Sequence, residues 1–413
     1  MNDGRWLLQL CLSRMGFAVI NTAYAALIPL LRPAWGMSAS QAGSVQSAWH
    51  TGYIVSLVVA SLLAGRFGAK RTFLGMGYAA CATALLFALG AHDFSSAFWL
   101  YGLAGLCAGG SYVPGLTLIA ERFPSARRGR AMGAYIAAAS LGYALGLPGS
   151  AWLAIHIAGW GANAGFLLAA GASLLGLGIA TWTLQYSKNV LIPATERGPL
   201  ATLASLHWLW KNKAARYVIL GYTFHAWELL GMWAWLPAFL SLAASRSGDG
   251  QLLASGLLAG ATLAALTHLL SMAGSLAGGV WSDRWGRTRV TLGLSLLSIA
   301  CALGFGWLLT APLWLLVLVA ILFNFAAIGD SAIYSAALTE VVPAHHLATA
   351  YALRSILGFG MGALSPWLFG LVLDLPGNTP ALAWGLAWSG LGIVALAGPY
   401  MTWRLMRWQL RRN

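Results

Sequence analysis

Long, uninterrupted apolar segments constrain this chain more than any other feature of its sequence. A helix needs about 20 mostly apolar residues to cross the hydrocarbon of a bilayer. Twelve segments reach roughly that length, at residues 6–31, 43–64, 72–91, 98–120, 130–153, 163–184, 217–240, 252–281, 290–310, 313–338, 349–373 and 383–403. They are continuous runs, whereas the strands of a membrane barrel alternate between apolar and polar residues. Because 59% of the residues are hydrophobic and 8% are charged, the chain cannot build an ordinary water-facing surface. The sequence therefore predicts an all-α membrane protein with twelve transmembrane helices.

The basic residues predict how these helices are oriented. With both termini in the cytoplasm, nearly all of the 24 Lys and Arg residues fall in cytoplasmic loops or at the termini, and only Arg32 and Arg246 lie on the opposite face. This distribution is the positive-inside pattern. The formal net charge of +14 is then mainly an orientation signal, so binding to nucleic acid is not expected. Short loops and termini indicate a bacterial inner (cytoplasmic) membrane.

The sequence also predicts a duplicated unit of six helices. Residues 185–216 form the longest interior loop, a polar linker between an N-terminal bundle at 1–184 and a C-terminal bundle at 217–413. Gly65 aligns with Asp283 at an offset of 218 residues, and an equivalent pair of loop segments later in each half agrees with that offset to within one residue. The repeat predicts two pseudo-symmetric six-helix bundles, with the binding site between them near the bilayer midplane.

One loop carries a family resemblance. The segment GVWSDRWGR at residues 279–287 resembles the loop motif of the major facilitator superfamily and occurs where that family has it, between spans 8 and 9. In the first-half copy, Ser61 and Gly65 replace the glycine and the aspartate of the motif. The resemblance implies the superfamily's fold, transport by alternating access, and a gating role for Gly279, Asp283, Arg284, Gly286 and Arg287. Asp283 is expected to cap or pair at a helix end, and the arginines are expected to contact phospholipid headgroups and carboxylates such as Glu340. The missing acid at position 65 is expected to weaken the matching contacts of the first half.

Four residues of fixed charge lie within the spans: Arg14, Glu228, Asp330 and Arg354. A charge at the centre of a membrane helix costs roughly 2.5–3.5 kcal/mol, so these side chains should face a cavity or one another. One interpretation is structural, with two ion pairs, most simply Asp330 with Arg354. The functional interpretation assigns substrate binding to the arginines, whose planar donor fork suits an oxyanion, and proton coupling to the carboxylates. The predicted substrate-binding residues are Arg14, Asn21, Tyr135, Trp235 and Arg354, and the predicted proton-coupling residues are His225, Glu228 and Asp330.

Histidines supply further alternatives. His225 lies three residues before Glu228 on one helix face, which predicts either a proton relay or a hydrogen bond that fixes the helix. His50 aligns with His268 at the offset of 218, so the two are predicted either to face a common cavity or to be packing residues. His268 and Met272 are four residues apart and so share one helix face. An imidazole with a thioether suits cuprous copper. No other metal and no cofactor is predicted, because the four cysteines fall inside apolar runs without metal-binding spacing.

Together these patterns predict a secondary active transporter that moves a small organic solute, expected to be an organic anion, in a proton-linked cycle. The alternatives are export of drugs or lipophilic cations by proton antiport, import of copper, and sensing without transport. No nucleotide-binding loop and no nucleophile with its base is recognisable, so neither an ATP-driven pump nor an enzyme is expected. The expected partners are a small-molecule substrate, protons and the lipid bilayer, and the protein is expected to be a monomer.

Overall fold

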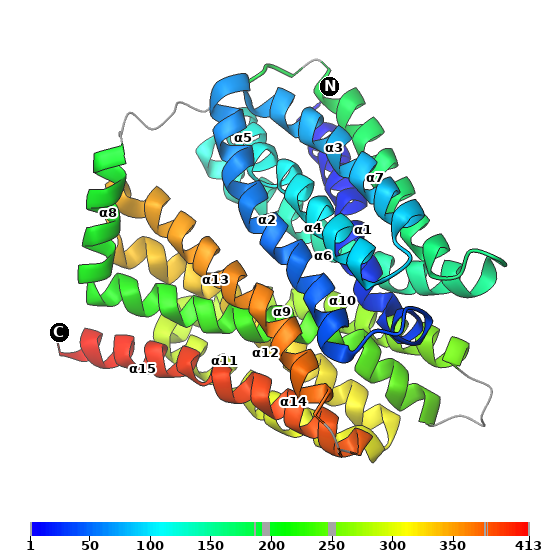
Figure 1. The fold of residues 1–413 in the computed structure, drawn as a ribbon. Coiled ribbons are helices and arrows are strands. Elements are labelled where there is room, and N and C mark those ends of the chain that lie inside the picture. The colour runs from blue at the N-terminus through cyan, green and yellow to red at the C-terminus, as the bar shows by residue number, and fades with distance from the viewer. Residues whose placement is uncertain are drawn as a thin grey trace. The chain divides into compact units, whose positions relative to one another are not determined.

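The computed structural model describes residues 2–185, 187–191, 199–246, 253–375, 377 and 379–411. These residues form helices joined by short turns, and no strand occurs among them (Figure 1). Within this part of the chain, 12 helical segments are long and apolar enough to cross a membrane. The predicted all-α architecture with twelve transmembrane helices is thus confirmed. Residues 192–198 of the predicted linker lie outside the described residues.

The helices follow one another with few intervening residues. The first eight elements are α1 Asp3–Ala34, α2 Ala39–Phe67, α3 Ala69–Gly90, α4 Phe94–Ala108, η1 Gly109–Ser111, α5 Val113–Arg122, α6 Ser125–His156 and α7 Ala162–Leu184. The remainder are α8 Pro199–Lys211, α9 Lys213–Arg246, α10 Leu253–Trp285, α11 Arg287–Phe305, η2 Gly306–Thr310, α12 Leu313–Val341, α13 Ala344–Leu373, α14 Pro380–Ala395 and α15 Ala397–Leu410. Several begin before the expected spans, because polar residues such as Ser38 and Asp93 cap their first turns.

Packing divides the chain into two compact units. The first contains Met1–Ala194 and Leu236–His268, and the second contains Thr195–Trp235 and Leu269–Asn413. Helices α9 and α10 are therefore both divided between the two units, and each of them has one segment in the first unit and one in the second. The partition into residues 1–184, 185–216 and 217–413 stays a prediction.

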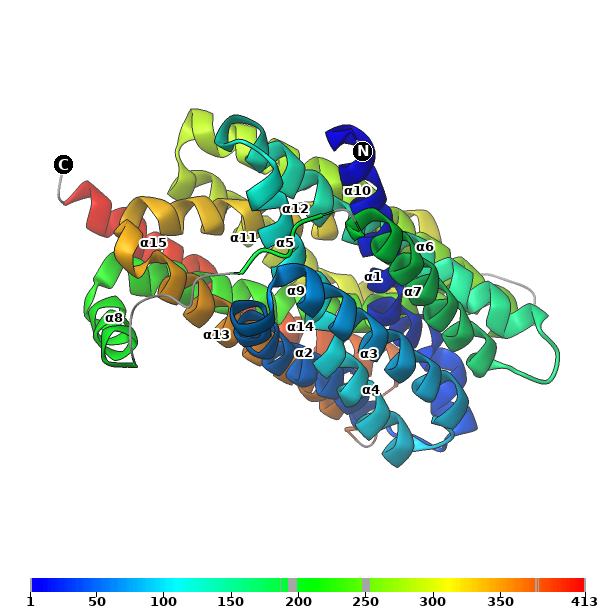
Figure 2. The ribbon, with the colours of Figure 1, turned by 90° about the horizontal axis from the view of Figure 1, so that it is seen from above.

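Aromatic and small residues build the interior of the first unit. Helix α1 packs against α6 and α7, α2 packs against α4, and α3 packs against α4 and α7 (Figure 2). Trp6, Phe73 and Tyr135 are among its fully buried side chains. Helices α2 and α4 approach closely because Gly105 has no side chain, and a Cβ at this position would collide with the backbone of Trp49.

The fourth span is broken, although the sequence predicts one continuous helix over 98–120. Helix α4 ends in the short turn η1, and α5 begins one residue later. Pro114 has no N–H to donate to the preceding turn, and its ring clashes with the carbonyl four residues earlier, so the helix cannot continue unchanged. The Ser56 hydroxyl of α2 accepts a hydrogen bond of 2.9 Å from the N–H of Gly109 in this turn. The break turns Ser111 toward α1 and α6.

The second unit contains a helix that the sequence pattern does not predict. Within the predicted linker, α8 lies beside α13 in both views (Figures 1 and 2). Leu209 of α8 is buried in the core of this unit, and the ring of Trp208 stacks on that of His346 with centroids 4.6 Å apart. The Nδ1 of His346 also lies 2.9 Å from the Ser205 hydroxyl. Elsewhere in the unit, α11 packs against α12 and α14, and α13 packs against α14.

Replacement of Gly105 by alanine is expected to lower the stability of the purified protein, because the new methyl group would be forced against the Trp49 backbone. Overpacking of this kind costs about 1–3 kcal/mol. Gly75 on α3 is the matched control, since a Cβ there meets no other atom within 4 Å and alanine is the better helix former. The measurement is the temperature at which half of the detergent-purified protein loses its monodisperse peak on size-exclusion chromatography. Equal midpoints for Gly105→Ala and Gly75→Ala would contradict the close approach of α2 and α4.

Candidate functional site

Arg14 lies in the interior of the first unit, where its partners are neutral. The residue is 8% exposed, and its Nη1 donates a hydrogen bond of 2.5 Å to the Ser111 hydroxyl. The rings of Tyr112 and Tyr135 lie 5.3 and 5.9 Å from the guanidinium carbon, and the Tyr53 hydroxyl is within hydrogen-bonding reach. Among the described residues, no carboxylate pairs with Arg14. This part of the chain therefore supplies no counter-ion for the buried positive charge.

A second contact holds Ser111, the residue to which Arg14 donates its hydrogen bond. The Tyr135 hydroxyl of α6 donates a hydrogen bond to the Ser111 carbonyl, so two helices hold the broken segment of the fourth span. The Nε of Arg14 is buried, and no described residue forms a hydrogen bond with it. A guanidinium binds carboxylates and phosphates through parallel N–H groups. Arg14 thus retains a donor that an anion could use.

The other predicted residues of the first unit lie on three helices. Asn21 on α1 has a buried Oδ1 that accepts no hydrogen bond from any residue that the structure describes. His50 on α2 is buried, and its Nε2 lies 3.4 Å from the Nε2 of Gln46. The His268 ring on α10 lies 6.1 Å from the Tyr143 ring, centroid to centroid. A common cavity for His50 and His268 stays a prediction.

His268 and Met272 lie one helical turn apart on α10, as their spacing predicts. In the part of the chain that the structure describes, no three His, Cys, Asp or Glu side chains gather as metal ligands would. An imidazole with a thioether can still bind cuprous copper. The copper site therefore also stays a prediction.

In the second unit, Asp330 connects three helices. One of its oxygens lies 2.8 Å from the Nδ1 of His225 on α9, and the other accepts a hydrogen bond of 2.7 Å from the Ser295 hydroxyl on α11. The contact with His225 has the separation of an ion pair, although its angles are not those of a hydrogen bond. The structure thus pairs Asp330 with His225 rather than with Arg354. Since both partners are buried, removal of either one would leave an unpaired polar group in the interior.

Glu228 lies one turn beyond His225 on α9 and is held by α11. Its Oε2 lies 3.1 Å from the Ser298 hydroxyl, which also lies 3.0 Å from the Ser295 carbonyl. A hydroxyl has a single hydrogen to donate. A protonated Glu228 can donate to Ser298 and let Ser298 donate to Ser295, whereas an ionised Glu228 leaves one of the two contacts unmade. Proton binding therefore completes this hydrogen-bond chain. The His225 ring makes no hydrogen bond among the described residues, so the predicted bond from His225 to Glu228 is absent.

Arg354 on α13 resembles Arg14 in having neutral partners. Its Nη1 donates a hydrogen bond of 2.6 Å to the Ser335 hydroxyl. The guanidinium carbon lies 4.2 Å from the centroid of the Tyr222 ring and 5.0 Å from that of Tyr351. Its Nε is buried without a hydrogen-bond partner in the described part of the chain. Of the residues that the structure describes, none gives Arg354 a carboxylate partner.

Trp235 lies in the packed interior of the second unit. Its indole N–H donates a hydrogen bond of 2.9 Å to the Pro366 carbonyl, and its ring stacks on Phe369 with centroids 5.4 Å apart. These contacts account for the position of the fully buried side chain. Contact between Trp235 and substrate stays a prediction.

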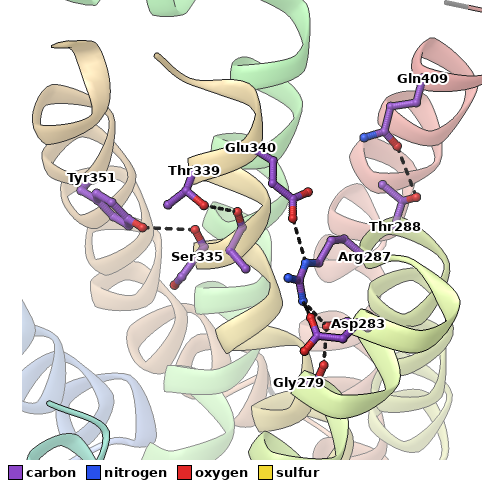
Figure 3. Close-up of polar contacts among 11 residues, drawn as sticks. Gly279, Asp283, Arg287, Thr288, Ser335, Thr339, Glu340, Tyr351 and Gln409 are labelled. Carbon is purple, nitrogen blue, oxygen red and sulfur yellow. Dashed lines mark hydrogen bonds and ion pairs between the residues drawn. The ribbon is translucent and has the colours of Figure 1, made fainter. Parts of the chain in front are cut away.

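The loop motif between α10 and α11 forms a polar network (Figure 3). Arg287 pairs with Asp283 one turn earlier (2.5 Å) and with Glu340 near the end of α12 (3.0 Å). It also donates a hydrogen bond of 2.7 Å to the Ser282 hydroxyl. Gly286 between the two helices has a φ of +92°, a conformation that residues with a side chain rarely adopt. The predicted contact between the motif and Glu340 is made by Arg287.

The remaining motif residues surround this network. The Gly279 carbonyl accepts a hydrogen bond of 2.8 Å from Ser282, and Arg284 is exposed. The Thr288 hydroxyl lies 3.4 Å from the Gln409 side chain of α15 (Figure 3). The network therefore ties α10, α11, α12 and α15 together at one end of the second unit.

The matching turn of the first unit is held without an acidic residue. The Asn189 side chain donates a hydrogen bond of 2.7 Å to the Phe67 carbonyl at the end of α2, and it accepts one of 3.2 Å from the N–H of Arg71 on α3. The Ala69 N–H donates to the Val190 carbonyl at 2.6 Å. These contacts satisfy backbone groups that helix ends leave unpaired.

Lys70, in the same turn, donates its hydrogen bonds to the segment that follows α7. Its Nζ donates hydrogen bonds to the carbonyls of Gln185 and Ser187, which follow α7, at 3.0 and 3.1 Å. A cation beside the last carbonyls of a helix is favourable. The segment after α7 therefore stabilises the turn between α2 and α3. In this turn Gly65 stands where the motif has an aspartate.

Sequence reasoning missed Ser295, Ser298 and Ser335. A serine by itself gives little signal in a membrane helix, where small residues are common. The spacing of Ser295 and Ser298 was nevertheless informative, because residues three apart share one helix face. Two hydroxyls on one face of the apolar helix α11 could have marked the side that meets the carboxylates.

Comparison with known sequences places these features in a family. The sequence model described as the Major Facilitator Superfamily matches residues 8–366. An uncharacterized MFS-type transporter of Mycobacterium tuberculosis (strain CDC 1551 / Oshkosh) is 27% identical, over 97% of this chain and 86% of the relative. A phosphoglycerate transporter protein of Salmonella typhimurium is 25% identical, over 89% and 82%. A probable sulfoacetate transporter of Cupriavidus necator is 25% identical, over 92% and 89%.

Solved structures share the fold at low sequence identity. The crystal structure of a mutant of the nucleoside transporter NupG matches with a TM-score of 0.76 and 15% identity, over 97% of this chain and 99% of that chain. At this level of identity, the likeness concerns the fold alone.

The two loop glycines are expected to respond differently to alanine. Gly68 (φ +89°) and Gly286 (φ +92°) share a backbone conformation in which a side chain costs about 1–3 kcal/mol. A Cβ on Gly68 would also collide with the Asn189 side chain, whereas a Cβ on Gly286 meets nothing within 4 Å. Gly68→Ala should therefore lower the thermal midpoint of the purified protein more than Gly286→Ala. Addition of Asn189→Ala should be less harmful in the Gly68→Ala background than in the wild type. Equal losses at the two glycines would contradict the role of Asn189.

Proposed function

Because the chain belongs to the major facilitator superfamily and is a multi-pass transporter of small solutes, we propose that its substrate is a small organic anion and that its transport is linked to protons. The anion would carry a carboxylate, phosphate or sulfonate group. The proposed location is the bacterial inner membrane, with both termini in the cytoplasm, as the distribution of Lys and Arg predicts.

The observation that carries this proposal is the neutral environment of Arg14. A buried guanidinium without a counter-ion is costly, and its contacts with Ser111 and the tyrosine rings replace only part of its hydration. An arginine with a purely structural role would be expected to have a carboxylate beside it, and none is found among the described residues. A substrate oxyanion would supply the missing charge.

Two further observations support an anion. Among the described residues, Arg354 in the second unit also contacts only a hydroxyl and aromatic rings and has no carboxylate partner. The names of two relatives specify phosphoglycerate and sulfoacetate, which are both small organic anions. Together these observations favour an anion over a lipophilic cation, which would need carboxylates free of protein partners.

The proposed proton linkage rests on the polar cluster of the second unit. With a neutral imidazole, Glu228 and Asp330 would place two negative charges in a buried region, and proton uptake reduces that cost. His225 beside Asp330 offers an imidazole that can both accept and donate a proton. Protonation of Glu228 completes the hydrogen bonds of Ser298. We propose that this cluster gains and loses protons during each transport cycle.

Arg14→Gln is expected to reduce the affinity for the anion at least about tenfold, because a hydrogen bond to a charged group contributes about 1.5–3 kcal/mol. The measurement is uptake of labelled 3-phosphoglycerate and sulfoacetate into proteoliposomes. Arg14→Lys retains the charge but not the planar fork and should be intermediate. Arg5→Gln, an exposed position on the same helix, is the matched control. Saturable uptake that is unchanged in Arg14→Gln would refute the anion site, and binding without uptake would identify a sensor.

Glu228→Gln is expected to separate exchange from proton-driven accumulation. The amide can donate to Ser298 as a protonated carboxyl does, so the variant should fold and exchange external for internal substrate. It has no proton to release, so a pH gradient should no longer drive accumulation. The measurement compares counterflow with gradient-driven uptake, with the exposed Glu121→Gln as control. Accumulation that persists in Glu228→Gln would remove this residue from the coupling mechanism.

A further inference from the structure

Gln46 and His50 form a second polar group in the first unit. They lie one turn apart on α2, and each is 3% exposed. Their only described contact with each other joins the two Nε2 atoms at 3.4 Å. Among the described residues, the Oε1 of Gln46 and the Nδ1 of His50 are buried without a hydrogen-bond partner. The Tyr101 hydroxyl is within hydrogen-bonding reach of the Gln46 side chain. Two polar atoms that could each bind a solute are therefore left within one helical turn.

The chemistry of these two atoms does not depend on which way the amide is turned. If the Gln46 amide nitrogen donates to His50, a neutral imidazole carries its proton on Nδ1, and a donor on His50 and an acceptor on Gln46 are left. If the amide is turned, its oxygen accepts from His50, and the remaining atoms exchange roles. Either arrangement leaves one donor and one acceptor. A hydroxyl group can pair with either of these atoms, because it both donates and accepts.

The pair lies on the helix face that also carries Tyr53. Gln46, His50 and Tyr53 are spaced by four and three residues, so they share one face of α2. The Tyr53 hydroxyl is within hydrogen-bonding reach of Arg14. The rise from His50 to Tyr53 is about 4.5 Å along the helix axis, which is comparable to the length of a short carbon skeleton. One small solute could therefore meet both groups.

The Trp49 side chain packs against His50 and Tyr53 on this face of α2. The Trp49 ring stacks on Tyr53 with centroids 5.0 Å apart and an interplanar angle of 10°. It also meets the His50 ring edge to face, with centroids 5.1 Å apart. Both side chains are thereby restricted before a solute arrives, which lowers the entropy lost on binding.

We infer that Gln46 and His50 bind a hydroxyl group of the substrate, and that the substrate class is a short hydroxylated anion such as a hydroxy acid or its phosphate ester. This inference rests on the proposed function, because it takes Arg14 as the site of the anionic group. It adds a specificity determinant on α2 that an anion site alone does not provide.

The test uses pairs of anions that differ in one hydroxyl. Lactate is compared with propionate, and 3-phosphoglycerate with its analogue that lacks the 2-hydroxyl, by calorimetric binding to the purified full-length protein and by counterflow in proteoliposomes. A site built to pair with a hydroxyl rejects the analogue that lacks it, so the hydroxylated member should bind at least about tenfold more tightly. Gln46→Leu and His50→Phe should bring this ratio close to one while the affinity for the deoxy member is kept. His92→Phe, at an exposed histidine between α3 and α4, should leave the ratio unchanged.

Each outcome separates the two ideas. Equal binding of both members, abolished by Arg14→Gln, would overturn the hydroxyl site and leave the anion transporter standing. Binding of glycerol but of no anion, lost in Gln46→Leu, would support the hydroxyl site and overturn the anionic substrate. Absence of binding by every compound would overturn both. The ratio in the wild-type protein decides the question even if one of the variants does not fold.

Discussion

Hydrocarbon offers no hydrogen bonds, so every polar group inside this protein must find its partner within the protein or in a solute. The broken fourth span shows how far this constraint reaches. Pro114 interrupts the helix, and the Ser56 hydroxyl accepts a hydrogen bond from the N–H of Gly109. Ser111 then contacts α1 and α6. Tyr135 binds the carbonyl of that same serine and Arg14 binds its hydroxyl. The environment of the buried arginine thus follows from one local break in the helix.

The two halves of the repeat use aligned positions for different chemistry. Ser111 aligns with Asp330, and Tyr135 aligns with Arg354, at an offset of 219 residues. In the first unit, the aligned positions surround a cation with hydroxyls and aromatic rings. In the second unit, they place a carboxylate beside an imidazole and an arginine beside a serine. This asymmetry is why the first unit is proposed to recognise the anion through Arg14, whereas proton binding is proposed for the second unit alone.

The loop turns show a similar divergence around a shared backbone. Gly68 and Gly286 adopt nearly the same φ. Around Gly286, the partly exposed Arg287 pairs with two carboxylates, and ion pairs of this kind are sensitive to salt. Around Gly68, the contacts come from the Asn189 amide and backbone groups, and a side-chain amide carries no charge to be screened. The backbone conformation is common to the two turns, whereas the interactions that hold them are not.

The sequence by itself determined the number of membrane helices and the family. A helix that crosses a bilayer needs a long apolar run, and the nine-residue loop motif is a contiguous segment, so both can be recognised without knowing how the helices pack. It also identified the four charged residues inside the spans, because charge is costly there whatever the packing. It did not determine their partners. The choice of His225 rather than Arg354 for Asp330, the serines of α11, and the packing of α8 on α13 depend on which helix faces meet. Those faces are set by contacts between segments far apart in the chain, so only the tertiary structure decided them.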